Sequence, residues 1–315
     1  MKQVVMARVV MARVVVARAA IGAMLLIAAG AAGAQGRDWS KVEIGTHKLA
    51  DGIYMLTGAG GNVGVSVGED GIVLIDDQYA PITPKIQAAL AALSDKPARF
   101  VINTHWHGDH TGGNENFGKA GAIIVAHDNV RRRLEAGKLA ELGGEGTPPA
   151  PKAALPVVTF TADVTIHSNG QELQVTHMAR SHTDGDSVIE FVEANVIHMG
   201  DIFFNGFYPF IDVDSGGSVD GVIATADRVL AMVDENTKIV PGHGKLASRA
   251  DLQRYREMLA AIRVNVSKLI AEGKTLEETV AAAPTKDFDP AWGTGGRTPE
   301  QITAAIYNSL KPKTQ

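Results

Sequence analysis

The sequence of 315 residues contains no cysteine. Neither a disulfide framework nor a thiolate ligand or nucleophile is therefore available to the protein. Aromatic residues make up only 5% of the chain, whereas 45% of the residues are hydrophobic and 21% are charged. The last two fractions are those of an ordinary globular protein, and the length allows one large domain or two smaller ones.

Clusters of positive charge are also scarce. The formal net charge is −5, and the one basic run, Arg131-Arg132-Arg133, lies in a segment with helical spacing. Binding to a phosphate backbone requires clustered Lys and Arg, so this run is more simply explained as a solvated helix face. We therefore expect a small-molecule substrate and no nucleic-acid partner.

The first 34 residues have the pattern of a cleavable signal peptide. Four basic residues and no acidic one accompany a short apolar run, Ala19–Ala31, and Ala32-Gly33-Ala34 matches an A-x-A cleavage site. The run is short for a membrane span, which favours cleavage over stable membrane insertion. We expect residues 1–34 to be removed, although two later methionines remain open as alternative starts. The domain would then comprise residues 35–315, with a net charge of −9 and a periplasmic or secreted location.

Apolar patterning divides the chain into two halves, each with strands followed by helices. Strand-like segments lie between residues 42 and 126 and again between residues 157 and 240. The Gly- and Pro-rich stretch 143–156 predicts an irregular loop or lid rather than a domain linker. Two sheets packed face to face, with helices outside, would bring strand ends from both halves to one edge, so we expect a single α/β domain.

The densest group of metal-ligand side chains lies in Thr104–Gly113, directly after an apolar segment that predicts a buried strand. His105 and His107 are two positions apart, so on an extended backbone their rings can point the same way. Asp109 and His110 then turn toward a second point. Imidazole and carboxylate groups are ligands of Zn²⁺, so the segment predicts a metal site. A loop of solvated or capping histidines is the alternative.

Three later segments place similar side chains at predicted strand ends. His182 lies in a polar turn, Asp201 follows an apolar strand, and His243 lies between two glycines. Glycine lets a backbone pass close to a site. The remaining histidines have no neighbouring motif, and an ordinary packed or surface role suits them better. They are His47, His127, His167, His177 and His198.

Seven side chains, taken in order, resemble the metallo-β-lactamase superfamily over residues 41 to about 249. They are His105, His107, Asp109, His110, His182, Asp201 and His243. The resemblance implies a four-layer αββα sandwich of two mixed β-sheets, with two zinc ions per chain in a shallow groove at the sheet edge. The first ion would lie between His105, His107 and His182, and the second between the remaining ligands. Asp201 would bridge the two ions or bind the second.

The ligand chemistry also stands without the resemblance. Seven ligands with no thiolate suit two divalent ions, which can share a hydroxide of lowered pKa and polarise the oxygen it attacks. Asp109 could orient that hydroxide and later transfer its proton, which makes Asp109 the predicted catalytic residue. Asp76, at a strand end ahead of the motif, is predicted to orient a ligand histidine, and Thr111 is a second candidate. Capping a turn is the alternative for both.

Aromatic side chains near the motif suggest a substrate groove. Trp106 lies inside the motif, and an aromatic run from Phe203 to Phe210 follows Asp201. This run could wall an apolar groove, with Tyr208 and Phe210 exposed. Packing on the core is at least as good an explanation for the first two phenylalanines of the run.

The fold alone does not settle the substrate, because members of the family catalyse different reactions. Three sequence features limit which of these reactions this chain can catalyse. His107 stands where the diiron electron-transfer relatives carry a glutamate, which favours hydrolysis over redox chemistry. Asp201 stands where many β-lactamases have Cys or Ser, as in glyoxalase II-like thioesterases and lactonases. Between Asp186 and His243 the only basic residues are Arg228 and Lys238, and neither directly follows Asp201. A strongly anionic substrate therefore lacks an obvious clamp there.

These features predict an exported, zinc-dependent hydrolase acting on a small amide, lactam, lactone or ester, with measurable β-lactam turnover among its expected activities. Two alternatives stay open at this point. One is a non-catalytic or accessory protein of the same fold that binds a metal or cofactor. The other is a mononuclear iron dioxygenase of the same fold.

Overall fold

The computed structural model describes residues 37–137 and 147–311, so the predicted signal peptide lies outside the described residues. Lys41–Gly137 and the chain from Pro149 onward form one compact unit, which contains both large sheets and the candidate site. Within the described ranges, no helix has both the length and the apolar character needed to cross a membrane.

The first sheet has seven strands whose spatial order follows the chain. They are β1 (Gly45–Ala50), β2 (Ile53–Thr57), β3 (Val63–Gly68), β4 (Gly71–Ile75), β5 (Ala98–Ile102), β6 (Ile123–His127) and β7 (Val158–Phe160). Strands β1 to β4 pair antiparallel, and β4 to β7 pair parallel. The parallel half brings the carboxyl ends of β4, β5 and β6 to one edge.

The second sheet has five strands in the order β13-β11-β10-β9-β8. They are β8 (Asp163–Ser168), β9 (Gln171–His177), β10 (Ser187–Phe191), β11 (Val196–His198) and β13 (Lys238–Val240). Only β11 and β13 pair parallel. A small third sheet joins β12 (Phe204–Asn205) to β14 (His243–Gly244), which follow β11 and β13 in the chain.

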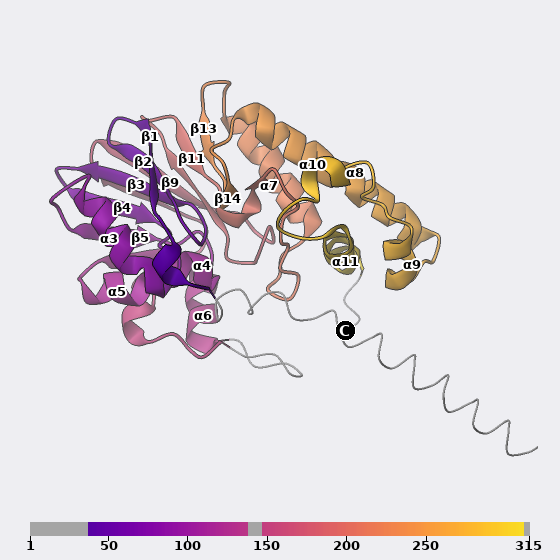
Figure 1. Ribbon diagram of the computed structural model, residues 1–315, viewed down its shortest axis with the longest axis horizontal. Coiled ribbons are helices and arrows are strands. Elements are labelled where there is room, and N and C mark those ends of the chain that lie inside the picture. Colours follow the sequence, from indigo (N-terminus) through magenta and orange to yellow (C-terminus); the bar gives the residue numbers. More distant parts are fainter. Residues whose placement is uncertain (1–36, 138–146, 312–315) are drawn as a thin grey trace, which may run out of the picture. The chain divides into compact units, whose positions relative to one another are not determined.

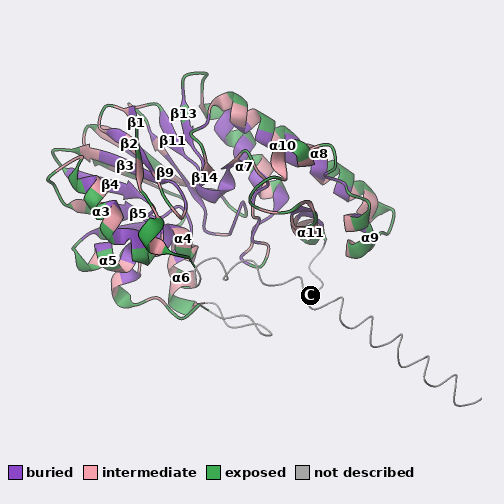
Figure 2. Cartoon of the chain, in the orientation of Figure 1, coloured by how far each residue is buried: buried purple, intermediate pink, exposed green. Residues whose placement is uncertain are grey.

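The two large sheets pack face to face through an apolar core. Ile75 and Ile102 of the first sheet lie in one buried cluster with Val175, Ile189 and Phe191 of the second. All five residues of β4 are buried, because helices cover the other face of the first sheet. A strand buried on both faces has a continuous apolar sequence rather than alternation. In Figure 2 the strands are accordingly mostly buried, whereas exposed residues lie on the helices and loops.

Helices form the two outer layers (Figure 1). Beside the first sheet lie α3 (Thr83–Ala91), α4 (Gly108–Thr111), α5 (Asn114–Lys119) and α6 (Asp128–Ala136). The second group contains α7 (Val219–Met232), α8 (Arg249–Ala271), α9 (Leu276–Ala281), α10 (Asp289–Trp292) and α11 (Pro299–Leu310). Short 3₁₀ turns are η1 (Trp39–Lys41), η2 (Ala80–Ile82), η3 (Lys152–Ala154) and η4 (Gly200–Ile202).

A second buried cluster joins the second sheet to its helices. Ile197 and Ile239 of that sheet pack with Val222 of α7, Leu259 of α8 and Ile306 of α11. The predicted four-layer αββα sandwich of two mixed sheets is therefore confirmed.

The long helix α8 shows how local sequence defines this outer layer. Ser248 and Asp251 form a capping box at its start, with each side chain accepting a hydrogen bond from the backbone N–H of the other. Its buried residues recur at helical spacing and form the stripe that packs on the sheet side. They are Leu252, Tyr255, Met258, Leu259, Ile262 and Val266.

Candidate metal centre

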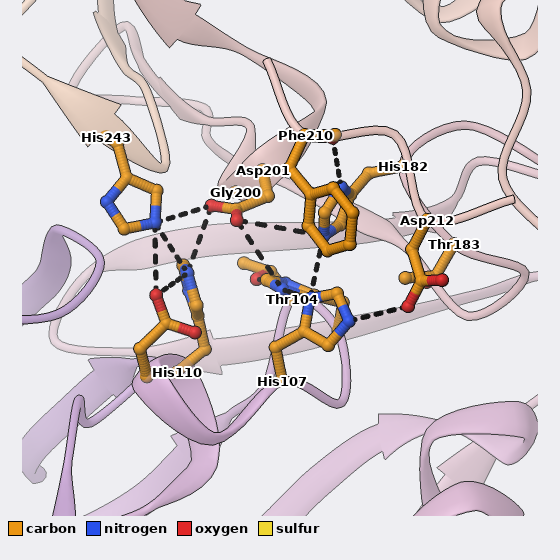
Figure 3. A network of polar contacts seen from close by, with 12 residues as sticks. Thr104, His107, His110, His182, Thr183, Gly200, Asp201, Phe210, Asp212 and His243 are labelled. Carbon is orange, nitrogen blue, oxygen red and sulfur yellow. Dashed lines mark hydrogen bonds and ion pairs between the residues drawn. The ribbon is translucent and has the colours of Figure 1, made fainter. Parts of the chain in front are cut away.

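All seven predicted ligands gather in two overlapping groups that follow strand ends of both sheets. Figure 3 labels five of them, His107, His110, His182, Asp201 and His243. From the first sheet, β5 leads into the loop that carries His105 and His107, and α4 then carries Asp109 and His110. From the second sheet, the connection from β9 to β10 carries His182. Turn η4 after β11 carries Asp201, and β14 after β13 carries His243.

The first group of ligand atoms comes from three histidines and Asp201. His107 Nδ1 lies 3.1 Å from His105 Nε2 and 2.9 Å from His182 Nε2. Asp201 Oδ2 lies 3.8 Å from His105 Nε2 and 3.7 Å from His182 Nε2. Four ligand atoms therefore converge on one point.

The second group shares Asp201 with the first. Its other oxygen, Oδ1, lies 3.0 Å from His110 Nε2 and 3.3 Å from His243 Nε2. Asp109 Oδ2 lies 3.2 Å from His243 Nε2 and 3.7 Å from His110 Nε2, and the two imidazole nitrogens are 3.4 Å apart. Asp201 thus presents one oxygen to each group.

These separations fit bound cations. A cation held tetrahedrally at about 2.0–2.1 Å from each ligand keeps the ligand atoms about 3.3–3.4 Å apart. The contacts above, from 2.9 to 3.8 Å, bracket that value. The lone pairs of two neutral imidazole nitrogens at such distances repel each other unless a proton or a cation lies between them. The donor set therefore fits a divalent metal in each group.

A third grouping of Asp76, His105 and His110 also lies close together. The Asp76 carboxylate, however, already accepts hydrogen bonds from the backbone N–H and the hydroxyl of Thr104, at 2.8 and 2.7 Å. It also lies 2.7 Å from His110 Nδ1. Asp76 therefore orients the His110 ring, whose Nε2 points into the second group.

Two histidines of the first group are held in the form that binds metal. Burial lowers the pKa of His105 well below its usual value and lowers the pKa of His182 to about 4. Both rings are therefore neutral at pH 7, and a neutral imidazole has a free lone pair for a cation.

The second group attracts positive charge. Burial opposes a charge on His243, but the carboxylates of Asp201 and Asp109 outweigh burial and raise the pKa of His243 to about 9. The pKa of His110 is raised for the same reason, against the effect of burial. Conversely, burial would raise the pKa of Asp109, but His110 and His243 lower it to about 2. The carboxylates are therefore ionised at neutral pH and favour a cation between them.

Sequence reasoning missed Asp212. Its Oδ2 lies 2.9 Å from Nε2 of His107, and its Oδ1 accepts a hydrogen bond from the backbone N–H of Ser215. Burial would raise the pKa of Asp212, but the interactions with His107, Ser215 and His182 together outweigh it, lower the pKa and keep the carboxylate ionised. This contact fixes His107 with Nδ1 toward the first group. The only local signal was a carboxylate two positions after Phe210, in a loop that is otherwise mostly apolar.

The aromatic residues do not all behave as predicted. Tyr208 was expected to be exposed, but it is fully buried, and its hydroxyl donates to the Asp289 carboxylate at 2.9 Å. The C-terminal segment covers it, since Tyr208 N–H donates to the carbonyl of Trp292. The prediction that Tyr208 lines a groove is therefore wrong. Phe203 and Phe204 are also buried, in agreement with the core alternative.

Phe210 and Trp106 differ in position. Phe210 is partly exposed, and its ring stacks on His107 with centroids 5.7 Å apart, so it borders the first group (Figure 3). Trp106 is only 9% exposed and packs with Ala126 and Val130, so it is not an open groove wall. The hydroxyl of Thr111 donates to the carbonyls of Trp106 and His107, so Thr111 supports the backbone of the loop rather than a ligand ring.

Glycine allows the backbone to approach two ligands closely. A Cβ atom on Gly242 would overlap Oδ1 of Asp201, and a Cβ atom on Gly61 would overlap the ring of His110. Each loop therefore encloses the second group only because these two positions have no side chain. Among the described residues, the metal-binding groups include none of the other five histidines.

Comparison with known proteins identifies relatives of this chain. Its residues 56–243 match the family model of the metallo-beta-lactamase superfamily. It is 28% identical over 159 residues to a hydroxyacylglutathione hydrolase of Polaromonas sp., covering 50% of this chain and 52% of that protein. It is 25% identical over 194 residues to the 2,4-dinitroanisole O-demethylase subunit alpha of Nocardioides sp., covering 61% of this chain and 55% of that protein. The chain spans about half the length of the curated relatives it matches.

Solved structures share its fold. A metallo-beta-lactamase from Pontibacter korlensis superposes with a TM-score of 0.57 at 18% identity, covering 69% of this chain and 99% of that one. The sec-alkylsulfatase Pisa1 from Pseudomonas sp. gives a TM-score of 0.65 at 18% identity, covering 85% of this chain and 50% of that one. At such identities the likeness establishes the fold alone.

Proposed function

The chain belongs to the metallo-beta-lactamase superfamily, and on that premise we propose that it is a hydrolase that uses two zinc ions. The observation that carries the proposal is the position of Asp201, which presents one carboxylate oxygen to each of two groups of His and Asp ligands. A carboxylate shared in this way suits two neighbouring cations.

Each residue has a defined task in this reaction. Two divalent ions at these positions would activate water for attack and polarise the bond that is attacked. Asp76 and Asp212 hold the rings of His110 and His107 in the orientation that presents one nitrogen to each group. Asp109 is ionised and its side chain is 22% exposed. Its carboxylate can therefore accept a hydrogen bond from the attacking water and transfer a proton to the leaving group.

The proposed substrate is a small amide, lactam, lactone or ester. Relatives named as hydroxyacylglutathione hydrolases support a hydrolytic reaction. We also propose export to the periplasm or the medium, for which the basic and apolar pattern of residues 1–34 is the support.

The test combines metal analysis with a substrate panel. Purified protein should contain about two zinc ions per chain. Zinc-loaded protein should hydrolyse at least one of five compounds: a β-lactam, a homoserine lactone, a thioester, a sulfate ester and a phosphodiester. His105→Ala and Asp109→Ala should each abolish that turnover. His47→Ala is the matched control, because His47 is exposed and belongs to neither metal-binding group.

Three results would overturn the proposal. Full turnover in either the His105 or the Asp109 variant would show that the metal centre does no catalysis. Zinc-loaded protein that turns over none of the five compounds but co-purifies with a stoichiometric organic ligand would support an accessory, non-catalytic protein. Bound iron with oxygen consumption would instead support a dioxygenase.

A further inference from the structure

An arginine from the C-terminal part of the chain lies beside the metal centre. Arg297 is in the loop between α10 and α11, outside the residues 56–243 that match the family. Its guanidinium carbon lies 4.0 Å from the centroid of the Phe210 ring. The same ring stacks on His107 and meets the ring of His182 edge-on, with centroids 5.7 and 5.6 Å apart. One aromatic side chain therefore contacts both the guanidinium and two metal-ligand histidines.

Backbone contacts fix this arginine in place. Gly296 forms a β-bridge with Tyr208, and the N–H of Arg297 points to the Tyr208 carbonyl at 3.5 Å. Tyr208 N–H in turn donates to the carbonyl of Trp292 at 2.9 Å. The buried Tyr208 thus anchors the C-terminal loop against the segment that carries Phe210. Backbone contacts and packing on Phe210 therefore position Arg297.

Among the described residues, the Arg297 guanidinium has no hydrogen-bond acceptor. Within residues 37–137 and 147–311, no carboxylate or carbonyl accepts a hydrogen bond from the Arg297 side chain, although the residue is half-buried. Asp212 is near enough to affect it electrostatically, but the two oxygens of Asp212 already bind His107 and the N–H of Ser215. By contrast, Arg133 and Arg256 each hold a carboxylate in a bidentate pair.

We propose that Arg297 binds an oxyanion on the substrate, a carboxylate or a sulfate group, beside the first metal-binding group; this rests on the proposed hydrolytic function. A guanidinium stacked on an aromatic ring keeps its N–H edges available for planar, paired hydrogen bonds. The carboxylates of Asp109 and Asp201 in the metal-binding groups, and that of Asp212, would repel an anion, and the Arg297 guanidinium supplies a positive charge on the Phe210 ring beside the first group. No basic residue directly follows Asp201, and on this proposal the clamp comes from further along the chain.

The first experiment compares two esters that share a scissile bond. One is the mono-p-nitrophenyl ester of succinic acid, which is an anion, and the other is its neutral methyl ester. Arg297→Gln should raise KM for the anionic ester about tenfold to a hundredfold, since a hydrogen bond to a charged group is lost. It should leave kcat/KM for the neutral ester within about twofold. For the anionic ester, the KM of Arg297→Lys should lie between those of the wild type and Arg297→Gln, because an ammonium keeps the charge but not the paired donors.

A matched arginine serves as the control. Arg99 also stacks on a phenylalanine, Phe100, with its guanidinium carbon 5.4 Å from the ring centroid. It lies near the start of β5, whereas the metal ligands follow the end of that strand. Arg99→Gln should therefore leave both esters unaffected. Equal losses for both esters in Arg297→Gln would show a merely structural role and overturn the proposal.

The second experiment does not depend on turnover. The affinities of succinate and of sulfate for zinc-loaded protein are measured by calorimetry in the wild type and in Arg297→Gln. Loss of succinate affinity alone would assign a carboxylate, and loss of sulfate affinity alone would assign a sulfate group. Unchanged affinity for both anions would overturn the proposal. If the wild type hydrolyses neither ester, the proposed hydrolysis fails on these compounds, while the calorimetric difference still decides the role of Arg297.

Discussion

At the scale of single residues, the metal centre depends on carboxylates that need not touch a metal. Asp212 holds His107 through Nε2, and Asp76 holds His110 through Nδ1. In each case the hydrogen bond fixes which ring nitrogen is available to a cation. His107 and His110 thus present opposite imidazole nitrogens, Nδ1 and Nε2 respectively, and a different buried carboxylate holds each ring.

This arrangement predicts the effect of removing Asp212. In Asp212→Ala, His107 loses the acceptor that orients its ring, so zinc affinity of the first group should fall about tenfold to a hundredfold. The second group does not contact Asp212 and should keep its affinity. Competition with a chromogenic chelator, titrated to two equivalents of zinc, separates the two sites. Asp214→Ala is the control, since Asp214 is exposed and lies only two positions away. Equal affinities in both variants would contradict the orienting role.

The sequence predicted the ligands and the supporting role of Asp76 but not that of Asp212, for a physical reason. His105, His107, Asp109 and His110 are neighbours in the chain, so their spacing alone indicates a shared target. Asp212 meets His107 only because two distant loops pack together, and no local pattern records that contact. Tyr208 was misjudged for the same reason: aromatic residues in a loop look exposed until another segment is known to cover them.

At the scale of elements, the loop between β2 and β3 encloses the second metal-binding group. The side chain of Gln78 accepts hydrogen bonds from the N–H groups of Ala59 and Gly60 and donates to the carbonyl of Gly61 at 2.7 Å. Gly61 N–H also donates to the carbonyl of Asp109. These bonds hold the loop directly against the ring of His110.

The close approach of Gly61 to the His110 ring predicts that Gly61→Ala is less stable and binds zinc more weakly. The added methyl group would overlap His110, so either the loop or the ring must move. We expect a loss of about 1–3 kcal/mol in the free energy of unfolding, together with weaker zinc binding to the second group. Urea unfolding and zinc titration measure the two effects. Gly108→Ala is the control, because a Cβ at Gly108 meets no atom within 4 Å. Unaltered zinc binding in Gly61→Ala would show that the loop yields without disturbing His110.

At the scale of the whole molecule, apolar patterning was sufficient to predict the layers. Strands such as β4, with the sequence Gly-Ile-Val-Leu-Ile, are apolar throughout because both faces are covered, and the helices carry spaced apolar residues. The position of the C-terminal helices could not be read in the same way. Their amphipathic pattern predicts that they pack, but not that the loop between α10 and α11 covers Tyr208 and places Arg297 beside Phe210.

Metal binding should also stabilise the packing of the two halves of the fold against each other. The first half of the chain supplies His105, His107, Asp109 and His110, and the second half supplies the other three ligands. Ions bound between them favour the folded state by mass action, each by about 4 kcal/mol when free zinc is a thousandfold above the dissociation constant of its site. Chelation should therefore lower the urea midpoint. Asp201→Ala removes the ligand common to both groups and should abolish most of this zinc-dependent stabilisation, whereas Asp214→Ala should retain it. A midpoint that is the same with zinc and with chelator would mean that the cations do not join the two sheets.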